Sequence, residues 1–287
     1  MARARVTALR WCCLSLYKNV RLIALDLDGT LLNDAKELTE RTQRALEAVS
    51  RSGIEVVLST GRPVTALPQE VAHFPYIKYA LTADGARIEN LRTGELLYEG
   101  LIPKEMVRPI YDIFDDYDVI EEIYIKGQGY ISEGDIDHLE EYTTNPAHAV
   151  YARRTRKRVK DIHDLLDQDI DKAHALFKSF EDREDAMRRI REIADFELCD
   201  AFPINLEVTA SGINKGEGLR ILGEKLGIRT KDMMAFGDSN NDAAMLQTAG
   251  VAVVMDNAYE SVKEMADMIA PSNEEDGVAA VIEQMLE

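Results

Sequence analysis

The sequence predicts an α/β fold, in which a mostly parallel sheet is covered by helices on both faces as a Rossmann-like core of three layers. Continuous apolar strands alternate with amphipathic helices over residues 20–85, and the same alternation returns near residue 213. Strands without polar alternation are typical of parallel sheets that are buried on both faces. The pattern changes between these two segments, which predicts an inserted α+β domain.

We therefore divide the chain into a core, an insertion and a tail. The core is predicted at 20–85 and 206–287, the insertion at 86–205, and a loose basic tail at 1–19. The tail contains arginine and lysine but no acidic residue. Its apolar stretch WCCLSL is shorter than the ~7–15 residues of a signal-peptide core, so we do not expect a targeting segment.

The first part of the core begins with an apolar strand at 20–26. The segment LTERTQRALEAVSRSG follows, with apolar residues near helical spacing, Thr39 as a candidate cap and Gly53 as the expected end of the helix. The segments IEVVLSTGR and YALTADGA predict two further buried strands. This order of strand, helix and strand favours parallel pairing.

The insertion has a different pattern. The segment ARIENLRTGELLYEG predicts two strands around a turn, and KEMVRPIYDIFDDY predicts a helix that Pro109 disturbs. The segment VIEEIYIKGQGYIS predicts two more strands, whereas residues 134–170 are polar and allow no assignment. A strand at 172–180, the helix REDAMRRIREIAD and two short strands in FELCDAFPINLEVTA complete the insertion.

The last part of the chain returns to alternating strands and helices. The segment KGEGLRILGEKLG predicts a helix, MMAFGDS a strand that ends at Asp238, and NDAAMLQTAG a helix closed by Gly250. A strand VAVVM, a helix YESVKEMA, a strand DMIA and a final helix DGVAAVIEQML follow.

The composition restricts the partners of the protein. Of the 287 residues 46% are apolar, and the net charge is −18 at pH 7. This charge disfavours binding to nucleic acids or anionic membranes, and no apolar run approaches the ~20 residues of a membrane span. Cys12, Cys13 and Cys199 form no disulfide or metal pattern, so we expect a reducing, cytoplasmic compartment. The five histidines show no ligand spacing, and the basic run 153–158 is predicted to be a solvated loop.

Four polar clusters follow predicted strands or begin predicted helices. They are Asp26-Leu-Asp28-Gly-Thr30, Ser59-Thr60-Gly61-Arg62, Lys215-Gly216 and Gly237-Asp238-Ser-Asn-Asn241-Asp242. Ligands of open α/β sheets bind beyond the carboxyl ends of the strands, so all four clusters can meet at one place.

The residue types indicate phosphoryl transfer. Carboxylates such as Asp26, Asp28 and Asp238 are the hard oxygen ligands that Mg²⁺ takes. One carboxylate can attack phosphorus, and a second can exchange protons with the leaving alcohol and with water. The hydroxyl of Thr60 and the ammonium of Lys215 can hold the phosphoryl oxygens.

With these four motifs in this order, the sequence resembles the haloacid dehalogenase superfamily over about 20–287. The motifs are DLDGT, STGR, the lysine of NKG and GDSNND. The large insertion between the second and third motifs resembles that of the Cof-type phosphatases, which act on sugar phosphates and related small phosphate esters. The resemblance implies that 86–205 form a cap over the active site.

The resemblance also implies a role for each site residue. Asp26 would be the nucleophile and Asp28 the general acid and base, and Asp26, the carbonyl of Asp28, and Asp238 would bind Mg²⁺. The phosphoryl group would be bound by Thr60 and Gly61 of the second motif, Lys215 of the third and Asn241 of the fourth. Asp242 would orient its neighbours.

The sequence departs from the family at one position. Members usually carry NGA after the third core strand, whereas this chain has Asp84 in the segment ADGA. If Asp84 faces the substrate, its charge would repel a second phosphate or a carboxylate and could accept hydrogen bonds from sugar hydroxyls.

Three functions fit this pattern. The first is a Mg²⁺-dependent phosphatase of small phosphorylated metabolites, acting through an aspartyl phosphate. The second is a phosphomutase of the same fold, and the third is a non-catalytic binding protein, which the presence of both Asp26 and Asp28 disfavours. The sequence names neither the substrate nor the oligomeric state.

Overall fold

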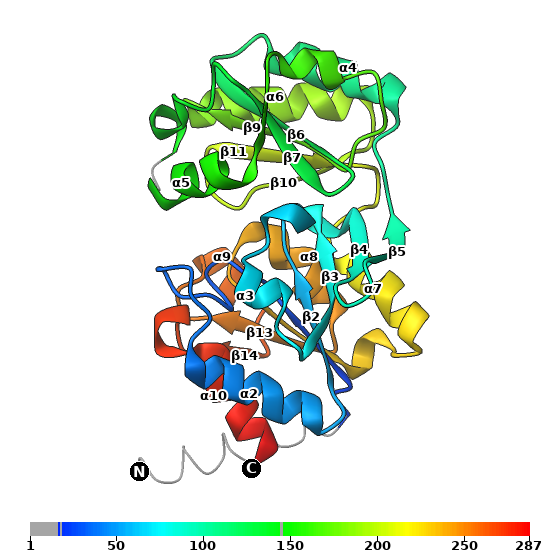
Figure 1. The fold of residues 1–287 in the computed structure, drawn as a ribbon, viewed down its shortest axis with the longest axis vertical. Helices are drawn as coiled ribbons and strands as arrows, with labels where there is room; N and C mark the ends of the chain where they lie inside the picture. Colours follow the sequence, from blue (N-terminus) through cyan, green and yellow to red (C-terminus); the bar gives the residue numbers. More distant parts are fainter. Residues whose placement is uncertain (1–16, 18, 144–145) are drawn as a thin grey trace.

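The computed structural model describes residue 17, residues 19–143 and residues 146–287. Two sheets lie one above the other, each with its own helices (Figure 1). The larger sheet belongs to the core, and the smaller sheet forms the cap. This arrangement confirms the predicted fold class.

The core sheet has eight strands in the order β14-β13-β12-β1-β2-β3-β4-β5. The first six are parallel, and β4 and β5 extend the sheet in antiparallel pairing. The strands are β1 (Leu22–Leu25), β2 (Glu55–Ser59), β3 (Ile77–Thr82), β4 (Arg87–Asn90), β5 (Glu95–Glu99), β12 (Met233–Gly237), β13 (Val251–Met255) and β14 (Met268–Ala270). The strand β1 lies near the centre of the sheet, where all four of its residues are fully buried.

Helices cover both faces of the core sheet. One apolar cluster joins the sheet to α2 and α10, and a second joins the opposite face to α7 and α8. The helices are α2 (Glu40–Arg51), α3 (Gln69–Ala72), α7 (Lys215–Leu226), α8 (Ala243–Thr248), α9 (Glu260–Lys263) and α10 (Gly277–Leu286). The helix α2 starts at the predicted cap, since the side chain of Thr39 accepts a hydrogen bond from the backbone of Thr42.

The cap sheet has six strands in the order β10-β11-β9-β6-β7-β8. Only the β7–β8 pair is parallel. Its strands are β6 (Val119–Ile125), β7 (Gln128–Ser132), β8 (Lys157–Val159), β9 (Lys172–Phe177), β10 (Glu197–Cys199) and β11 (Asn205–Thr209), and its helices are α4 (Lys104–Phe114), α5 (Pro146–Thr155) and α6 (Phe180–Ile193). The helices α4 and α6 share an apolar cluster with one face of this sheet.

The two sheets divide the chain at other positions than the sequence predicted. The strands β4 and β5, which we expected in the insertion, pair with β3 and belong to the core sheet. The strand β11, whose residues 206–209 we expected in the core, pairs with β9 in the cap sheet. A hairpin at the edge of a sheet has the same sequence pattern in either domain, so strand pairing alone decides its place.

The predicted tail at 1–19 lies mostly outside the described residues, as do Cys12 and Cys13. Tyr17 is described, and it is not loose as predicted. It is buried against the core, and its hydroxyl donates to the sulfur of Met268 at 3.5 Å. Among the described residues, no helix combines the length and the apolar character that crossing a membrane requires.

Candidate active site

A cavity of about 450 Å³ lies between the carboxyl ends of the core strands and the cap sheet. The loops after β1, β2 and β12 line its floor with the predicted residues Asp26, Asp28, Thr60, Gly61, Asp238 and Asn241. Cap residues form its roof: Tyr124, Thr143, Tyr151, Arg156, His174, Asn205 and Glu207. Three of the four sequence motifs therefore reach one cavity.

The third motif, which contains Lys215, lies directly behind Asp26. The ammonium of Lys215 contacts Oδ1 of Asp26 at 2.7 Å and Oδ1 of Asp242 at 2.7 Å, although Lys215 and Asp26 are 189 positions apart. Lys215 is fully buried and does not line the cavity. Its predicted contact with a phosphoryl group therefore stays a prediction, whereas its ion pair with Asp26 is present.

Asp242 fixes the loop that carries Asp238. Its Oδ2 accepts hydrogen bonds from the backbone nitrogens of Asp238 at 3.0 Å and Ser239 at 3.1 Å. Both oxygens of Asp242 are thus engaged, one by this loop and one by Lys215. This arrangement fits the orienting position that the family resemblance implies for Asp242.

Asp238 faces the loop of the first motif. Its Oδ1 accepts a hydrogen bond from Thr30 at 2.8 Å. A Cβ at Gly29 would stand 2.5 Å from Oδ2 of Asp238, and Gly29 has a φ of +85°. Glycine is therefore required at this position both by the backbone conformation and by the close approach of Asp238.

The carboxylates of this region are suited to a divalent cation. Oxygens of Asp26, Asp238 and Asp242 lie within 4.8 Å of one another. Burial and the neighbouring Asp242 raise the pKa of Asp238 to about 7, and the same two causes raise the pKa of Asp26. Negative charge therefore exceeds what Lys215 compensates, and hard oxygen donors at this spacing fit Mg²⁺.

Asp28 pairs with basic residues outside this group of carboxylates. Arg62 binds it with two hydrogen bonds of 2.6 and 2.7 Å, and Lys36 contacts it at 2.8 Å. Burial alone would raise the pKa of Asp28, but Arg62 and Lys36 outweigh it and hold that pKa well below its usual range. Asp28 is therefore ionised here, and its partners are Arg62 and Lys36.

Sequence reasoning assigned no role to Arg62, although this residue is part of the second motif. Its guanidinium lies over the ring of Tyr151 at 4.1 Å and donates to the carbonyl of Ala66 at 3.2 Å. Arg62 thus joins Asp28 in the core to α5 in the cap. A bidentate arginine–carboxylate pair fixes both position and orientation.

Thr60 and Asn241, the remaining predicted residues of the floor, are each held by hydrogen bonds. Thr60 is buried, and its hydroxyl accepts a hydrogen bond from the backbone nitrogen of Arg62 at 3.2 Å. Asn241 accepts from Ser239 at 2.8 Å and donates to Asp84 at 3.3 Å. These contacts fix the orientation of both side chains beside Asp26.

The structure corrects the expectation for Asp84. This residue is 1% exposed and does not line the cavity. Lys172 of the cap contacts Oδ2 of Asp84 at 2.7 Å, Oε1 of Glu207 at 3.0 Å and the carbonyl of Gly61 at 2.7 Å. Asp84 is therefore not an unpaired charge facing the substrate but one side of a buried ion pair that joins core and cap.

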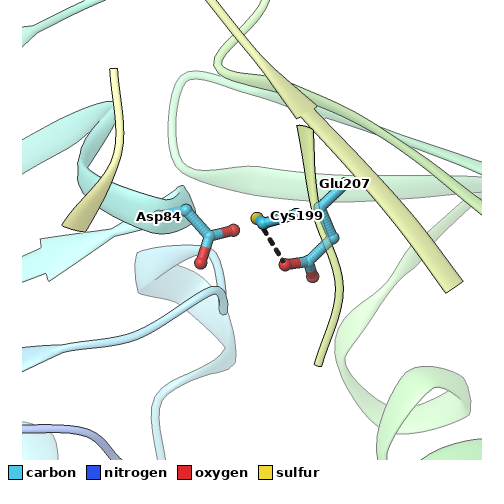
Figure 2. Close-up of side chains that lie close together, drawn as sticks. All are labelled: Asp84, Cys199 and Glu207. Atoms are coloured by element: carbon cyan, nitrogen blue, oxygen red, sulfur yellow. Dashed lines mark hydrogen bonds between the residues drawn. The ribbon is translucent and has the colours of Figure 1, made fainter. Parts of the chain in front are cut away.

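Figure 2 shows Asp84 facing Glu207 and Cys199, whose sulfur lies 3.7 Å from Oε2 of Glu207. These three side chains could hold a metal by their spacing alone. However, the ammonium of Lys172 bridges the two carboxylates. Burial raises the pKa of Asp84 while Lys172 lowers it, with a net decrease, and burial beside Asp84 raises the pKa of Glu207. The lysine therefore supplies the cation of this group.

The roof of the cavity contains a second buried ion pair. Arg156 contacts Glu122 at 2.6 Å and the hydroxyl of Tyr124 at 2.6 Å. The prediction of a solvated loop at 153–158 is wrong, because 153–155 belong to α5, 157–158 belong to β8 and Arg156 is only 6% exposed. Its partner Glu122 is 34 positions away in the sequence. A run of basic residues does not indicate which acidic residue each of them will pair with.

Two further roof residues have polar atoms without a hydrogen-bond partner among the described residues. The atoms are Nε2 of His174 and Nδ2 of Asn205, and both residues line the cavity. The backbone nitrogens of Ala201 and Phe202 donate to Oδ1 of Asn205 at 3.0 Å each, which fixes the orientation of the amide. Nδ1 of His174 lies 3.3 Å from Glu122, which leaves Nε2 as the free nitrogen.

Comparison with known proteins identifies the family. The family model for haloacid dehalogenase-like hydrolases matches residues 23–282. The chain is 30% identical to the 5-amino-6-(5-phospho-D-ribitylamino)uracil phosphatase YcsE of Bacillus subtilis, over 92% of this chain and 95% of that protein. A haloacid dehalogenase-like hydrolase structure from B. subtilis has a TM-score of 0.82 at 27% identity, over 92% of this chain and 99% of that chain.

A sugar phosphatase of subclass IIB has the same fold, with a TM-score of 0.80 at 24% identity over 92% of this chain and 98% of that chain. The first six core strands, the ordered motifs and the inserted cap sheet agree with these matches. The chain is a phosphatase that belongs to the haloacid dehalogenase-like hydrolases.

Proposed function

We propose that the protein is a Mg²⁺-dependent phosphatase that hydrolyses a small phosphate monoester through an aspartyl phosphate on Asp26. The ion pair of Asp26 with Lys215 at the floor of the cavity is the observation that supports this proposal most directly. Asp26 and Asp238 would hold the ion, together with the backbone carbonyl of Asp28. When bound, Mg²⁺ would supply positive charge to the phosphoryl oxygens and to the nucleophile.

The residues of the chain have separate tasks in this reaction. Asp26 attacks phosphorus, and the bond from phosphorus to the leaving alcohol breaks. Asp28 gives a proton to that alcohol and later takes one from the water that attacks the aspartyl phosphate. Because Arg62 holds Asp28 ionised in this conformation, the first step needs Asp28 to gain a proton and loosen this pair.

The leaving group would bind beneath the cap. We propose a sugar, a sugar alcohol or a related polar group, because His174 and Asn205 place unpaired polar atoms at the roof. The fixed amide of Asn205 would donate to a hydroxyl or carbonyl oxygen, and Nε2 of His174 would accept from a hydroxyl or amide group. The Bacillus relative acts on a phosphorylated ribitylaminouracil, which contains groups of this kind.

Removal of the metal tests the proposal. We expect the protein to hydrolyse p-nitrophenyl phosphate with Mg²⁺, to lose this activity in excess chelator and to regain it when Mg²⁺ is restored. Undiminished turnover after exhaustive metal removal would contradict the role of the ion. Analysis of the products by ³¹P NMR separates the mutase alternative, since a mutase returns the phosphoryl group to an alcohol instead of releasing phosphate.

Substitution of Asp26 by Asn tests the nucleophile. The change removes the attacking charge with almost no change in size, so we expect turnover to fall by more than about 10³-fold with the fold intact. Asp34→Asn is the matched control, because Asp34 lines the same cavity but bonds to Asn273 instead of Lys215. Substantial activity in the Asp26 variant would show that another group attacks.

A further inference from the structure

Glu121 of the cap is a buried carboxylate without a hydrogen bond among the described residues. It is 6% exposed, and its Oε1 is completely buried without a partner. A buried carboxylate of this kind is costly unless it is neutralised by a proton or a cation. Successive residues of a strand face opposite sides, and the neighbouring Glu122 faces the cavity with Arg156. Glu121 therefore lies on the other face of the cap sheet, away from the candidate active site.

His163 lies beside Glu121, together with a second carboxylate. Nε2 of His163 is 3.2 Å from Oδ2 of Asp115 and 3.9 Å from Oε2 of Glu121. The three residues come from separate elements: the end of α4, strand β6 and the turn at Ile162–Leu165. One atom from each lies within 4.8 Å of the others. Ligands of a tetrahedral metal with bonds of ~2.1 Å stand roughly 3.4 Å apart, which is close to these distances.

The tautomer of His163 also suits a metal. Its Nδ1 lies 3.0 Å from Oδ1 of Asp161, and a carboxylate can only accept, so Nδ1 carries the proton. Nε2 then directs a lone pair toward Asp115 and Glu121, which also present lone pairs. This arrangement is unfavourable unless a cation lies between them, either a proton or a metal ion. A carboxylate bound to the second nitrogen of a histidine is the usual support of a metal-ligating histidine.

We propose that Asp115, Glu121 and His163 form a metal site on the outer face of the cap, which binds a divalent transition ion such as Zn²⁺ with water completing its coordination. One imidazole and two carboxylates are ligands that zinc accepts. The ion would tie α4 and the 162–165 turn to the cap sheet. This site is separate from the proposed Mg²⁺ site and independent of the proposed reaction.

Protons compete with a metal for these ligands, because imidazole and carboxylate groups bind a metal only in their deprotonated forms. Zn²⁺ binding is therefore measured at pH 8.

The test measures Zn²⁺ binding to the full chain in saturating Mg²⁺, by competition with a chromogenic chelator. All variants carry Cys12→Ser and Cys13→Ser, so that these thiols cannot take the metal. We expect one Zn²⁺ per chain. Glu121→Gln and His163→Ala should each weaken this binding at least tenfold.

The chain offers a matched pair of control variants. His138 and Glu141 are also paired on the cap, at 2.7 Å, but both are largely exposed and belong to no three-ligand group among the described residues. His138→Ala and Glu141→Gln should leave Zn²⁺ binding unchanged. Retained hydrolysis of p-nitrophenyl phosphate shows that the variants fold.

A melting experiment gives a second readout. At pH 8, Zn²⁺ should raise the melting temperature of the wild type, whereas Glu121→Gln should show no response to Zn²⁺. Absence of Zn²⁺ binding by the wild type would overturn the proposal. Equal binding by wild type and His163→Ala would also overturn it, because the metal would then lie elsewhere.

Discussion

At the scale of single residues, Arg62 links the proposed proton-transfer residue to the cap. It holds Asp28 with two hydrogen bonds and lies against Tyr151 of α5. The position of Asp28 therefore depends mainly on Arg62, with Lys36 as a second contact. A change in the position of α5 would reach Asp28 through the side chain of Arg62.

We predict that Arg62→Lys lowers kcat/KM by roughly tenfold or more, because lysine cannot form the bidentate contact. A double-mutant cycle identifies the cause. If Arg62 acts through Asp28, then Arg62→Lys should cost little further activity in an Asp28→Asn background. Additive losses in the two variants would show that Arg62 acts on the substrate or on the fold instead. Lys36→Gln is the control. Lys36 makes only one contact with Asp28, so this change should lower kcat/KM less than Arg62→Lys does.

At the scale of the elements, a buried ion pair joins the turn after β3 to strand β9. Asp84 shares the ammonium of Lys172 with Glu207, and all three side chains are buried. Removing one partner of a buried ion pair lowers the free energy of unfolding more than removing one partner of an exposed pair does. The contact therefore stabilises the position of the cap over the core.

We predict that Asp84→Asn destabilises the protein by about 1.5–3 kcal/mol, because Lys172 loses a charged acceptor and keeps Glu207 and the carbonyl of Gly61. The melting temperature should fall by several degrees. Relative rates with singly and doubly charged substrates should stay the same, since Asp84 does not line the cavity. Asp167→Asn is the control, because Asp167 is 92% exposed and should change the stability little.

The sequence predicted the parts of the site that are encoded locally. The motifs around Asp26, Thr60 and Asp238 follow apolar strands, and parallel pairing brings such strand ends together. It could not predict the partners that the cap supplies, because Lys172, which neutralises Asp84, lies in another sheet. Nor could the sequence group Asp115, Glu121 and His163, because these residues meet only through tertiary packing.

The division of the chain was predicted less well than its motifs. The segment 86–100 was correctly expected to form two strands, but it extends the core sheet instead of the cap sheet. Secondary structure follows from local sequence, whereas the sheet that a strand joins depends on which edge is available.

At the scale of the whole molecule, Tyr17 marks where the described part of the core begins. Tyr17 is the first described residue and is buried against the core, where it contacts Met268. A deletion that keeps Tyr17 therefore leaves every contact described here in place.

We predict that deletion of residues 1–16 leaves the melting temperature and kcat/KM nearly unchanged. A deletion of 1–17 should lower the melting temperature, because it also removes the buried ring of Tyr17. Comparison of the two variants separates the tail from Tyr17. A large loss of soluble protein with the shorter deletion would show that the tail contributes to the fold.

The insertion of the cap between β5 and α7 also affects how the protein is made. The strand β1 pairs with β2 on one side and with β12 on the other, but β12 begins only at Met233. At about 5–20 residues per second, roughly 10–40 s separate the synthesis of β1 from that of β12. During this time one edge of β1 has no partner, and an open apolar edge is the usual starting point of aggregation. The cap sheet is continuous in the chain and can fold meanwhile, so the nascent core depends most on protection by chaperones.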